Sequence, residues 1–368
     1  MSEWLTKGGV GSAYFSNQSV EAPKKMVKIF PGEQERGDTT YFASVVKNNY
    51  IVRTKIVVSD VLITCYELKD GKPVELWSNT TYCYGGVHIV GAYVVAGDGV
   101  FSLEKGEKLI SIPREKSDIR TRSTLYSEVF LVKTGAGKSY SFDVKLGDEN
   151  ERSIGPVMMW DHVHGFAFGI DVKEQQLVAS SLSSCCIAWK FNLDIFLDSC
   201  GWNLEQKIVP MCVSGQCIYV VVGGWLIVLS LFTGELISKI EYFRSYVEER
   251  ILAMYPGLTI GNHYHANQIA TNGKQVCLVN YGHPSWLLLL DKGMEVLWSH
   301  VTSDQYSAAI IGNIIFTTSE SYHRGYKLET GEEVWKSANK SNCSDIFVGE
   351  KCIYFENPNG YVERYDWG

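Results

Sequence analysis

A short unit of two apolar segments joined by a polar turn recurs along this chain, and it restricts the fold more than any other feature. The clearest copy, YKLETGEEVWKS, begins at Tyr326, turns at Gly331 and carries Trp335 in its second segment. Two apolar runs joined by a polar pair and a glycine are typical of a β-hairpin. Similar units occupy residues 64–78, 100–113, 225–240 and 287–300. The sequence therefore predicts a repeat protein built from hairpins.

The spacing of the turn glycines predicts how the hairpins assemble. Most neighbouring copies lie about 40 residues apart, and one interval of about twice that length contains a degenerate copy at residues 188–200. Residues 242–255 show the apolar spacing of a helix and predict a helical insertion. The turn glycines are Gly71, Gly106, Gly147, Gly234, Gly293 and Gly331. Because a period of roughly 40 to 45 residues holds about four strands, we expect an all-β fold, a β-propeller of about seven or eight four-stranded blades.

The two ends of the chain predict how the ring closes. Residues 1–40 are rich in polar residues and glycine, and we expect them to form an arm, while residues 41–368 form the propeller, all within a single domain. The last unit, Cys352 to Trp367, ends after its third strand, and an unpaired strand edge invites aggregation. We therefore expect the arm to donate a closing strand, from Met26 to Phe30 or from Ala13 to Ser16.

Charge and hydrophobicity exclude several classes of partner. The formal net charge is −7, so no basic surface is expected to gather phosphates, and we expect no nucleic acid partner. No apolar run approaches the roughly 18 residues of a membrane span, and the first residues lack the pattern of a secretory signal. Most of the ten cysteines stand in apolar runs, as reduced core cysteines do. We expect a cytoplasmic protein that binds a small molecule or a protein and no membrane.

The hairpins also carry a more specific signature, Thr-Gly followed by a tryptophan. The best copy is LETGEEVW at residues 328–335, and FTGEL at residues 232–236 follows the same pattern. This signature resembles the repeat of the quinoprotein-dehydrogenase-like, or PQQ-like, propellers, in which the tryptophan docks on a neighbouring blade. The resemblance implies a propeller fold, but this family includes dehydrogenases that bind the quinone and scaffold proteins that bind no cofactor. The tryptophan follows the glycine by six residues at Gly71, five at Gly293 and four at Gly331, which predicts a docking geometry that varies between blades.

Two adjacent cysteines bear on whether the chain binds the quinone cofactor. In the quinone-binding members of that family, a vicinal cysteine pair forms a strained disulfide ring beside the cofactor. Here Cys185 and Cys186 stand in an apolar context, SSCCIAW, in which we expect one to face each side of a strand. We therefore do not expect PQQ as a cofactor.

Histidines form the one constellation with chemical potential. His162 and His164 form one H-x-H pair and His263 and His265 form another, and we expect each pair to lead into the first strand of a blade. Residues two apart in a strand point to the same side, and the first strand of a blade is innermost. We therefore predict the pairs at one end of the central channel, where they could bind a divalent metal or act as catalytic acid and base. Further predicted ligand-binding residues are His88, His283, Tyr264, Asn267, Trp160, Tyr281 and Trp286.

Two functions stay open at this point. The first is a binding or interaction module with a histidine- and aromatic-lined central channel, since no nucleophile constellation is recognised in the sequence. The alternative is an enzyme that uses the histidine cluster, through a divalent metal or through acid–base chemistry, on a small-molecule substrate. A third, structural interpretation is that the histidines are polar channel residues bonded to each other and to water.

Overall fold

The protein is described by a computed structural model. It describes residues 14–16, 23, 25–30, 41–47, 49–57, 60–81, 87–96, 99–111, 123–126, 129–133, 139–143, 159–161, 164–184, 186–197, 209–261, 265–280, 284–302, 307–319, 321–339, 345–348, 352–356 and 362–366.

The described strands form eight sheets, and the first four follow the chain in order. The first contains β3 (Tyr41–Lys47), β4 (Tyr50–Val57), β5 (Asp60–Lys69) and β6 (Lys72–Thr81). The second contains β7 (Val87–Val90), β8 (Tyr93–Ala96), β9 (Gly99–Ser102) and β10 (Lys108–Ser111). The third has three described strands, β11 (Ser123–Tyr126), β12 (Val129–Lys133) and β13 (Ser139–Asp143). The fourth contains β14 (Met159–Asp161), β15 (Phe166–Asp171), β16 (Gln176–Ser181) and β17 (Ile187–Asn192).

The other four sheets complete the series. The fifth contains β18 (Met211–Ser214), β19 (Cys217–Val222), β20 (Trp225–Ser230) and β21 (Leu236–Glu241). The sixth contains β22 (Gln268–Thr271), β23 (Gln275–Asn280), β24 (Ser285–Asp291) and β25 (Val296–Thr302). The seventh contains β26 (Ser307–Ile311), β27 (Ile314–Thr318), β28 (Tyr322–Lys327) and β29 (Glu333–Ala338), together with β1 (Tyr14–Ser16). The eighth contains β30 (Asp345–Val348), β31 (Cys352–Glu356) and β32 (Val362–Asp366), together with β2 (Lys25–Phe30).

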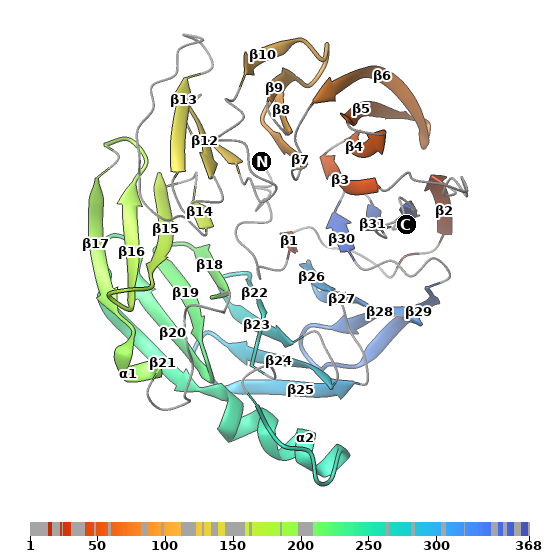
Figure 1. The fold of residues 1–368 in the computed structure, drawn as a ribbon. Helices are drawn as coiled ribbons and strands as arrows, with labels where there is room; N and C mark the ends of the chain where they lie inside the picture. Colours follow the sequence, from red (N-terminus) through yellow and green to blue (C-terminus); the bar gives the residue numbers. More distant parts are fainter. Residues whose placement is uncertain are drawn as a thin grey trace.

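The sheets are arranged around a common centre as the blades of a propeller (Figure 1). Within each blade, consecutive strands pair antiparallel, so each blade is a meander. First strands of neighbouring blades contact each other, as β14 does with β18, β18 with β22, β22 with β26, β26 with β30, and β30 with β3. The prediction of an all-β propeller with four-stranded blades is confirmed.

The two N-terminal strands join different blades. β2 pairs antiparallel with β32 on the outside of the eighth blade, and β1 pairs parallel with β26, the first strand of the seventh. Both segments that the sequence offers as strand donors are therefore strands, but they add to different sheets.

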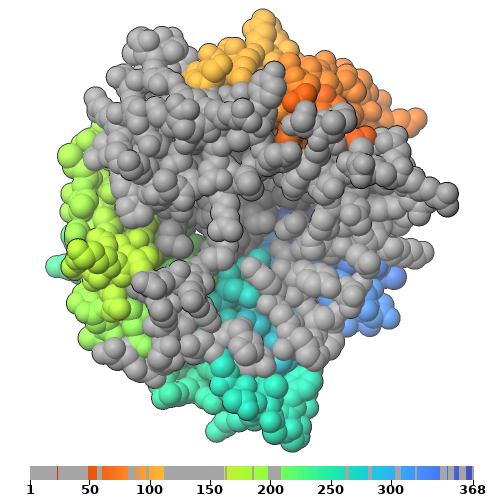
Figure 2. Space-filling view, in the orientation of Figure 1, coloured from red at the N-terminus to blue at the C-terminus, as the bar shows by residue number. Residues whose placement is uncertain are grey.

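The predicted helical insertion is also present, although its first half is unusual. It consists of the π-helix η3 (Phe243–Glu248), followed directly by α2 (Glu249–Met254). Phe243, Val247 and Ile251 are buried on one face of this segment. The segment lies outside the sixth blade, on the rim of the molecule (Figures 1 and 2). A further short helix, α1 (Asp194–Leu197), follows β17. Within the described ranges, no helix is long and apolar enough to cross a membrane.

Three tryptophans dock on the next blade through their indole N–H groups. Each indole donates a hydrogen bond to the backbone carbonyl of a buried leucine at the end of the third strand of that blade. The pairs are Trp77 with Leu103, Trp189 with Leu231 and Trp298 with Leu328, at 2.8, 2.8 and 2.9 Å. Because each bond crosses between blades, these tryptophans stabilise the ring more than their own sheets.

The repeated glycine is required because the docked indole lies directly against it. Gly106, Gly234 and Gly331 have φ of +70°, +72° and +70°, in the left-handed region that favours glycine. A Cβ atom on these residues would lie 2.5, 2.6 and 2.8 Å from the facing tryptophan ring. The glycine of the repeat therefore accommodates the tryptophan of the preceding blade, not that of its own hairpin.

One turn corrects the predicted variation in docking geometry. In the β24–β25 turn, the residue with positive φ is Met294, at +68°, one position after the expected Gly293. Counted from this residue, Trp298 follows by four positions, the same offset as Trp335 has from Gly331. The predicted spacing of five residues, counted from Gly293, therefore started from the wrong residue of the turn.

A bulge interrupts each of six outer strands, β6, β10, β17, β21, β25 and β29. In each strand the pairing register skips one residue, and in β6, β17 and β25 the skipped residue immediately precedes the docked tryptophan. The skipped residues are all aliphatic: Leu76, Leu109, Ala188, Ile237, Leu297 and Val334. Because a bulge leaves its extra residue unpaired, it re-aims the side chains around it.

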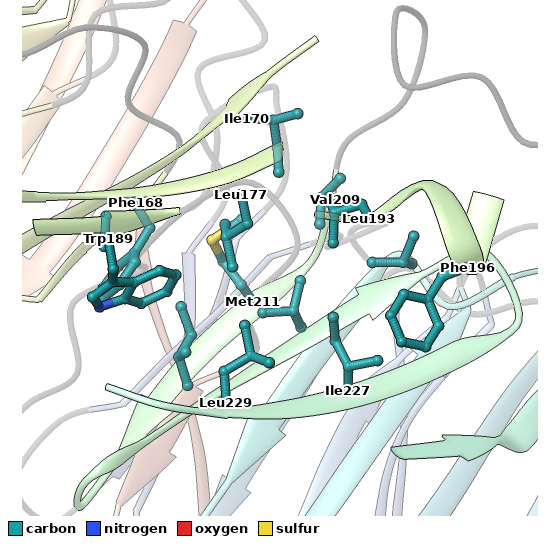
Figure 3. Close-up of a cluster of buried hydrophobic side chains, with 14 of the residues drawn as sticks. Phe168, Ile170, Leu177, Trp189, Leu193, Phe196, Val209, Met211, Ile227 and Leu229 are labelled. Atoms are coloured by element: carbon teal, nitrogen blue, oxygen red, sulfur yellow. The ribbon is translucent and has the colours of Figure 1, made fainter. Parts of the chain in front are cut away.

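The core between the fourth and fifth blades illustrates how neighbouring blades pack (Figure 3). Phe168, Leu177 and Trp189 of the fourth blade meet Ile227 and Leu229 of the fifth in one buried cluster. Burying such side chains contributes about 1.5–3 kcal/mol each, so blade junctions supply much of the stability.

Candidate functional site

The structure places the predicted site residues unevenly. His162, His263, Tyr264, Tyr281 and His283 lie outside the described residues. His88 lies in β7 and Trp160 in β14, and their strand positions are all that is described. Side chains are described for His164, His265, Asn267 and Trp286.

His265 lies at the junction of the fifth and sixth blades, three residues before β22. Its buried ring packs edge-on against Phe243 of the π-helix, with 4.7 Å between ring centroids. Its backbone carbonyl accepts a hydrogen bond of 2.7 Å from the Asn280 side chain. The helical insertion and the end of β23 thus fix this histidine in place.

Tyr242 organises the same junction. Its hydroxyl donates to the carbonyl of Gly223 at 2.8 Å and accepts from the backbone N–H of Ala266 at 2.9 Å. Trp286 is fully buried against Tyr242 and Phe243. Trp286 is therefore a core residue, and its predicted place in the lining of a ligand pocket is wrong.

The backbone N–H of Asn267 donates to the carbonyl of Val279 at 2.9 Å, which continues the β-sheet pairing.

His164 lies in the turn between β14 and β15, held by a buried carboxylate. Its Nδ1 atom lies 2.7 Å from Oδ2 of Asp161, and its backbone N–H donates to the same oxygen at 3.3 Å. An ionised carboxylate accepts hydrogen bonds and cannot donate them, so Nδ1 of neutral His164 carries the hydrogen and Nε2 keeps a lone pair. The side chain is 28% exposed and packs edge-on against Phe232 of the fifth blade, with 5.8 Å between centroids.

These two histidines lie at opposite ends of a blade, which corrects the prediction of one cluster. A Cβ atom on Gly224, just before β20, would lie 3.9 Å from Nε2 of His265, whereas Phe232, just after β20, contacts His164. At about 3.3 Å per residue, β20 separates the two sites by roughly 20 Å. The physical reason is a shift of strand assignment: the segment around His162 and His164 follows the first strand of its blade, where the prediction placed it before that strand.

Two further histidines have structural partners. Nε2 of His300 lies 2.7 Å from the carbonyl oxygen of Gly331, and its ring packs between Trp298 and Tyr326. His323 is fully buried, and burial lowers its pKa because the interior disfavours the charged form. Among the residues that the structure describes, no group of three or more side chains could bind a metal ion.

Buried His323 belongs to a polar network that crosses between the last two blades. Its Nδ1 atom lies 2.9 Å from Oγ1 of Thr318, and its Nε2 atom lies 3.5 Å from a carboxylate oxygen of buried Glu363. Tyr365 donates to the same carboxylate at 3.1 Å and lies 3.0 Å from Oγ of Ser337. The network is closed to solvent, so its role is to join blades.

Most cysteines of the described ranges lie in the core, as predicted. Cys65, Cys212, Cys277 and Cys352 are free and buried, Cys217 is free and partly buried, and Cys186 is free and exposed. Cys186 lies in the turn before β17 and not within a strand, so the expectation that it faces one side of a strand is wrong.

An exposed apolar surface, which sequence reasoning missed, adjoins the site of His164 through Phe232. Phe232, Leu236, Ile237 and Ile187 are 49%, 41%, 57% and 58% exposed. Ile187 lies two residues before Trp189, and the other three flank Gly234, on which Trp189 docks. We call these four residues the Phe232 patch. A signal was present in the repeat, because Phe232 stands where the equivalent turns carry Glu104 and Glu329.

The fold is a β-propeller, and solved structures of other propellers align with most of the chain. Neither a model of a protein family nor the sequence of a curated protein matches the chain. Among solved structures, BamB from Moraxella catarrhalis aligns with a TM-score of 0.63 at 11% identity, over 94% of this chain and 99% of BamB. Saccharomyces cerevisiae Sqt1 aligns with a TM-score of 0.67 at 9% identity, over 95% of this chain and all of Sqt1. Quinohemoprotein alcohol dehydrogenase from Comamonas testosteroni aligns with a TM-score of 0.58 at 11% identity, over 95% of this chain and 76% of the dehydrogenase chain. At these identities the similarity concerns the fold.

Proposed function

We propose that this propeller is a protein-binding module and that the Phe232 patch is its contact surface. The observation that carries the proposal is the exposure of four large apolar side chains around one blade junction. Single exposed apolar residues are normal on protein surfaces, but their concentration at one place marks an interaction site.

The fold supports this use of the patch. Ile237 is exposed because the bulge of β21 turns it away from the core, and Phe232 is exposed because it occupies a turn. Neither residue is needed to fill its own blade. Aromatic residues at the centre of an apolar patch commonly dominate the energy of protein association.

Partner capture followed by reconstitution tests the proposal. A partner identified by affinity purification would be purified and titrated against the wild type and against the double variant Phe232→Ser and Ile237→Ser. We expect the double variant to weaken binding by at least about tenfold while it stays folded, with a melting temperature lowered by at most a few degrees, because about half of each side chain is exposed.

Val172→Ser provides the matched control, because Val172 is an exposed aliphatic residue of the fourth blade in the β15–β16 turn, at the other end of β16 from Ile187. It should bind the partner as the wild type does. Equal binding by the double variant and the wild type would place the contact surface elsewhere and reject the proposal.

We do not propose the alternative of a histidine-based enzyme. That function needs the two H-x-H pairs together, whereas His164 and His265 lie at opposite ends of β20. A small-molecule ligand near His263 and His265 and a cytoplasmic location stay predictions, and replacing both histidines by alanine in a thermal-shift screen tests the first.

A further inference from the structure

We propose that His164 and Phe232 form a subsite for an arginine side chain of a protein partner. The guanidinium group stacks on the exposed ring of Phe232 and donates a hydrogen bond to Nε2 of His164. This inference rests on the proposed function, because it specifies the chemistry of the partner that the Phe232 patch binds.

The first argument concerns the acceptor. Asp161 is buried and bonds to both the ring and the backbone of His164, so it fixes the position of the imidazole and the hydrogen on Nδ1. The opposite nitrogen, Nε2, is then an acceptor on a half-buried, immobilised ring. A pre-positioned acceptor loses little entropy on binding, which favours a donor from the partner.

The remaining described histidines differ from His164 in this respect. Nε2 of His300 already lies against the carbonyl of Gly331, and His323 and His265 are buried. In His164, by contrast, the anchored nitrogen is Nδ1, and the side chain is 28% exposed.

The second argument concerns the aromatic ring. Phe232 is half-exposed in its turn, and a cation over such a ring is attracted by the negative face of the π-system. This chain already makes such a contact at its surface. Nζ of Lys336 lies 4.0 Å from the centroid of the exposed Tyr322 ring.

The third argument is charge. Three turns adjoin the site, residues 161–166, 181–187 and 231–236, and they contain Asp161 and Glu235 but no lysine or arginine. The whole chain carries a net charge of −7. A cationic group is therefore attracted to this junction, at short range by the turns and at long range by the chain. Arginine fits better than lysine because its planar group can stack on an aromatic ring while its edge N–H groups donate hydrogen bonds.

Peptide binding by the full-length protein tests the inference. The probes are three fluorescent nonapeptides in which glycine alternates with arginine, lysine or citrulline. Citrulline keeps the planar shape but has no charge, and lysine keeps the charge but is not planar. We expect the arginine peptide to bind about 3- to 10-fold more tightly than the lysine peptide. Its advantage over the citrulline peptide should be larger.

Two variants separate the subsite from general attraction by the acidic chain. Phe232→Leu removes the π-system and His164→Leu removes the acceptor, and each should abolish the preference for arginine over lysine. The matched control is Tyr322→Leu, which removes an exposed aromatic ring from the seventh blade and should leave the preference intact. Equal binding of the arginine and lysine peptides, or an arginine preference that survives both site variants, overturns the inference.

The outcome is separable from that of the proposed function. If the captured partner needs the Phe232 patch but binds equally after its arginines are replaced by lysine, the protein-binding function stands and the arginine subsite is rejected. If the partner binds without the patch, the proposed function fails, and the peptide preference alone decides whether the subsite exists.

Discussion

At the scale of single residues, the contact between Trp189 and Gly234 has a direct energetic consequence. An alanine Cβ at position 234 would lie 2.6 Å from the indole and would also adopt a φ of +72°. We predict that Gly234→Ala destabilises the protein by about 2–4 kcal/mol, the sum of backbone strain and steric overlap. Urea unfolding measures the change.

Gly215→Ala separates the two contributions. Gly215 also has a positive φ, +58°, but a Cβ there would meet no atom within 4 Å. This variant should lose about 1–2 kcal/mol from backbone strain alone. Equal losses in the two variants would show that the indole contact contributes nothing.

Buried His323 predicts a pH dependence of stability. Its pKa in the folded protein is lowered from 6.5, mainly by burial, which Glu363 offsets in part. The stabilisation that neutral His323 confers is therefore complete above pH 6.5 and is lost as the pH falls below it, because the unfolded chain then binds a proton that the folded chain does not.

The comparison of His323→Gln with the wild type measures this effect. Between pH of about 7 and about 5, the free energy of unfolding should fall less steeply for His323→Gln, by up to about 1.4 kcal/mol per pH unit. Parallel curves for His323→Gln and the wild type would contradict a lowered pKa.

At the scale of secondary-structure elements, the hairpin repeat was predictable and the register of the histidines was not. Apolar runs and turn glycines report local backbone geometry, so they identified the hairpins around Gly106, Gly234 and Gly331. The residues around His164 carry the same apolar pattern on both sides, and pattern alone does not distinguish a turn within a blade from a connection between blades. The prediction therefore took the strand after His164, β15, for the first strand of its blade, although it is the second.

Contacts between elements explain what else the sequence left out. Trp189 belongs to the copy that lost its glycine, yet it docks on Gly234 because the glycine of a docking pair belongs to the next blade. Phe232 reads as an ordinary turn residue until the turns of neighbouring blades are placed side by side. Both features depend on pairs of residues from different repeats, which a search for one repeat at a time does not compare.

At the scale of the whole molecule, the first and last blades meet through a shared core. Ile51 and Leu68 of the first blade form a buried cluster with Cys352, Tyr354 and Val362 of the eighth. β2 adds to β32 on the outside of that eighth blade. A blade that packs on its neighbour and also receives a strand from the N-terminal arm couples the two ends of the chain.

We predict that removing residues 1–31, which deletes β1 and β2, lowers the melting temperature by about 5–10 °C or makes the protein insoluble. The loss of the β2–β32 hydrogen bonds removes on the order of 3–5 kcal/mol, and it leaves β32 as an open edge that other chains can pair with. The control is removal of residues 1–12, which spares both strands and should leave the melting temperature unchanged. Scanning calorimetry and size-exclusion chromatography of both truncated proteins decide the matter. If the longer truncation melts like the full chain and stays monodisperse, the N-terminal arm does not close the ring.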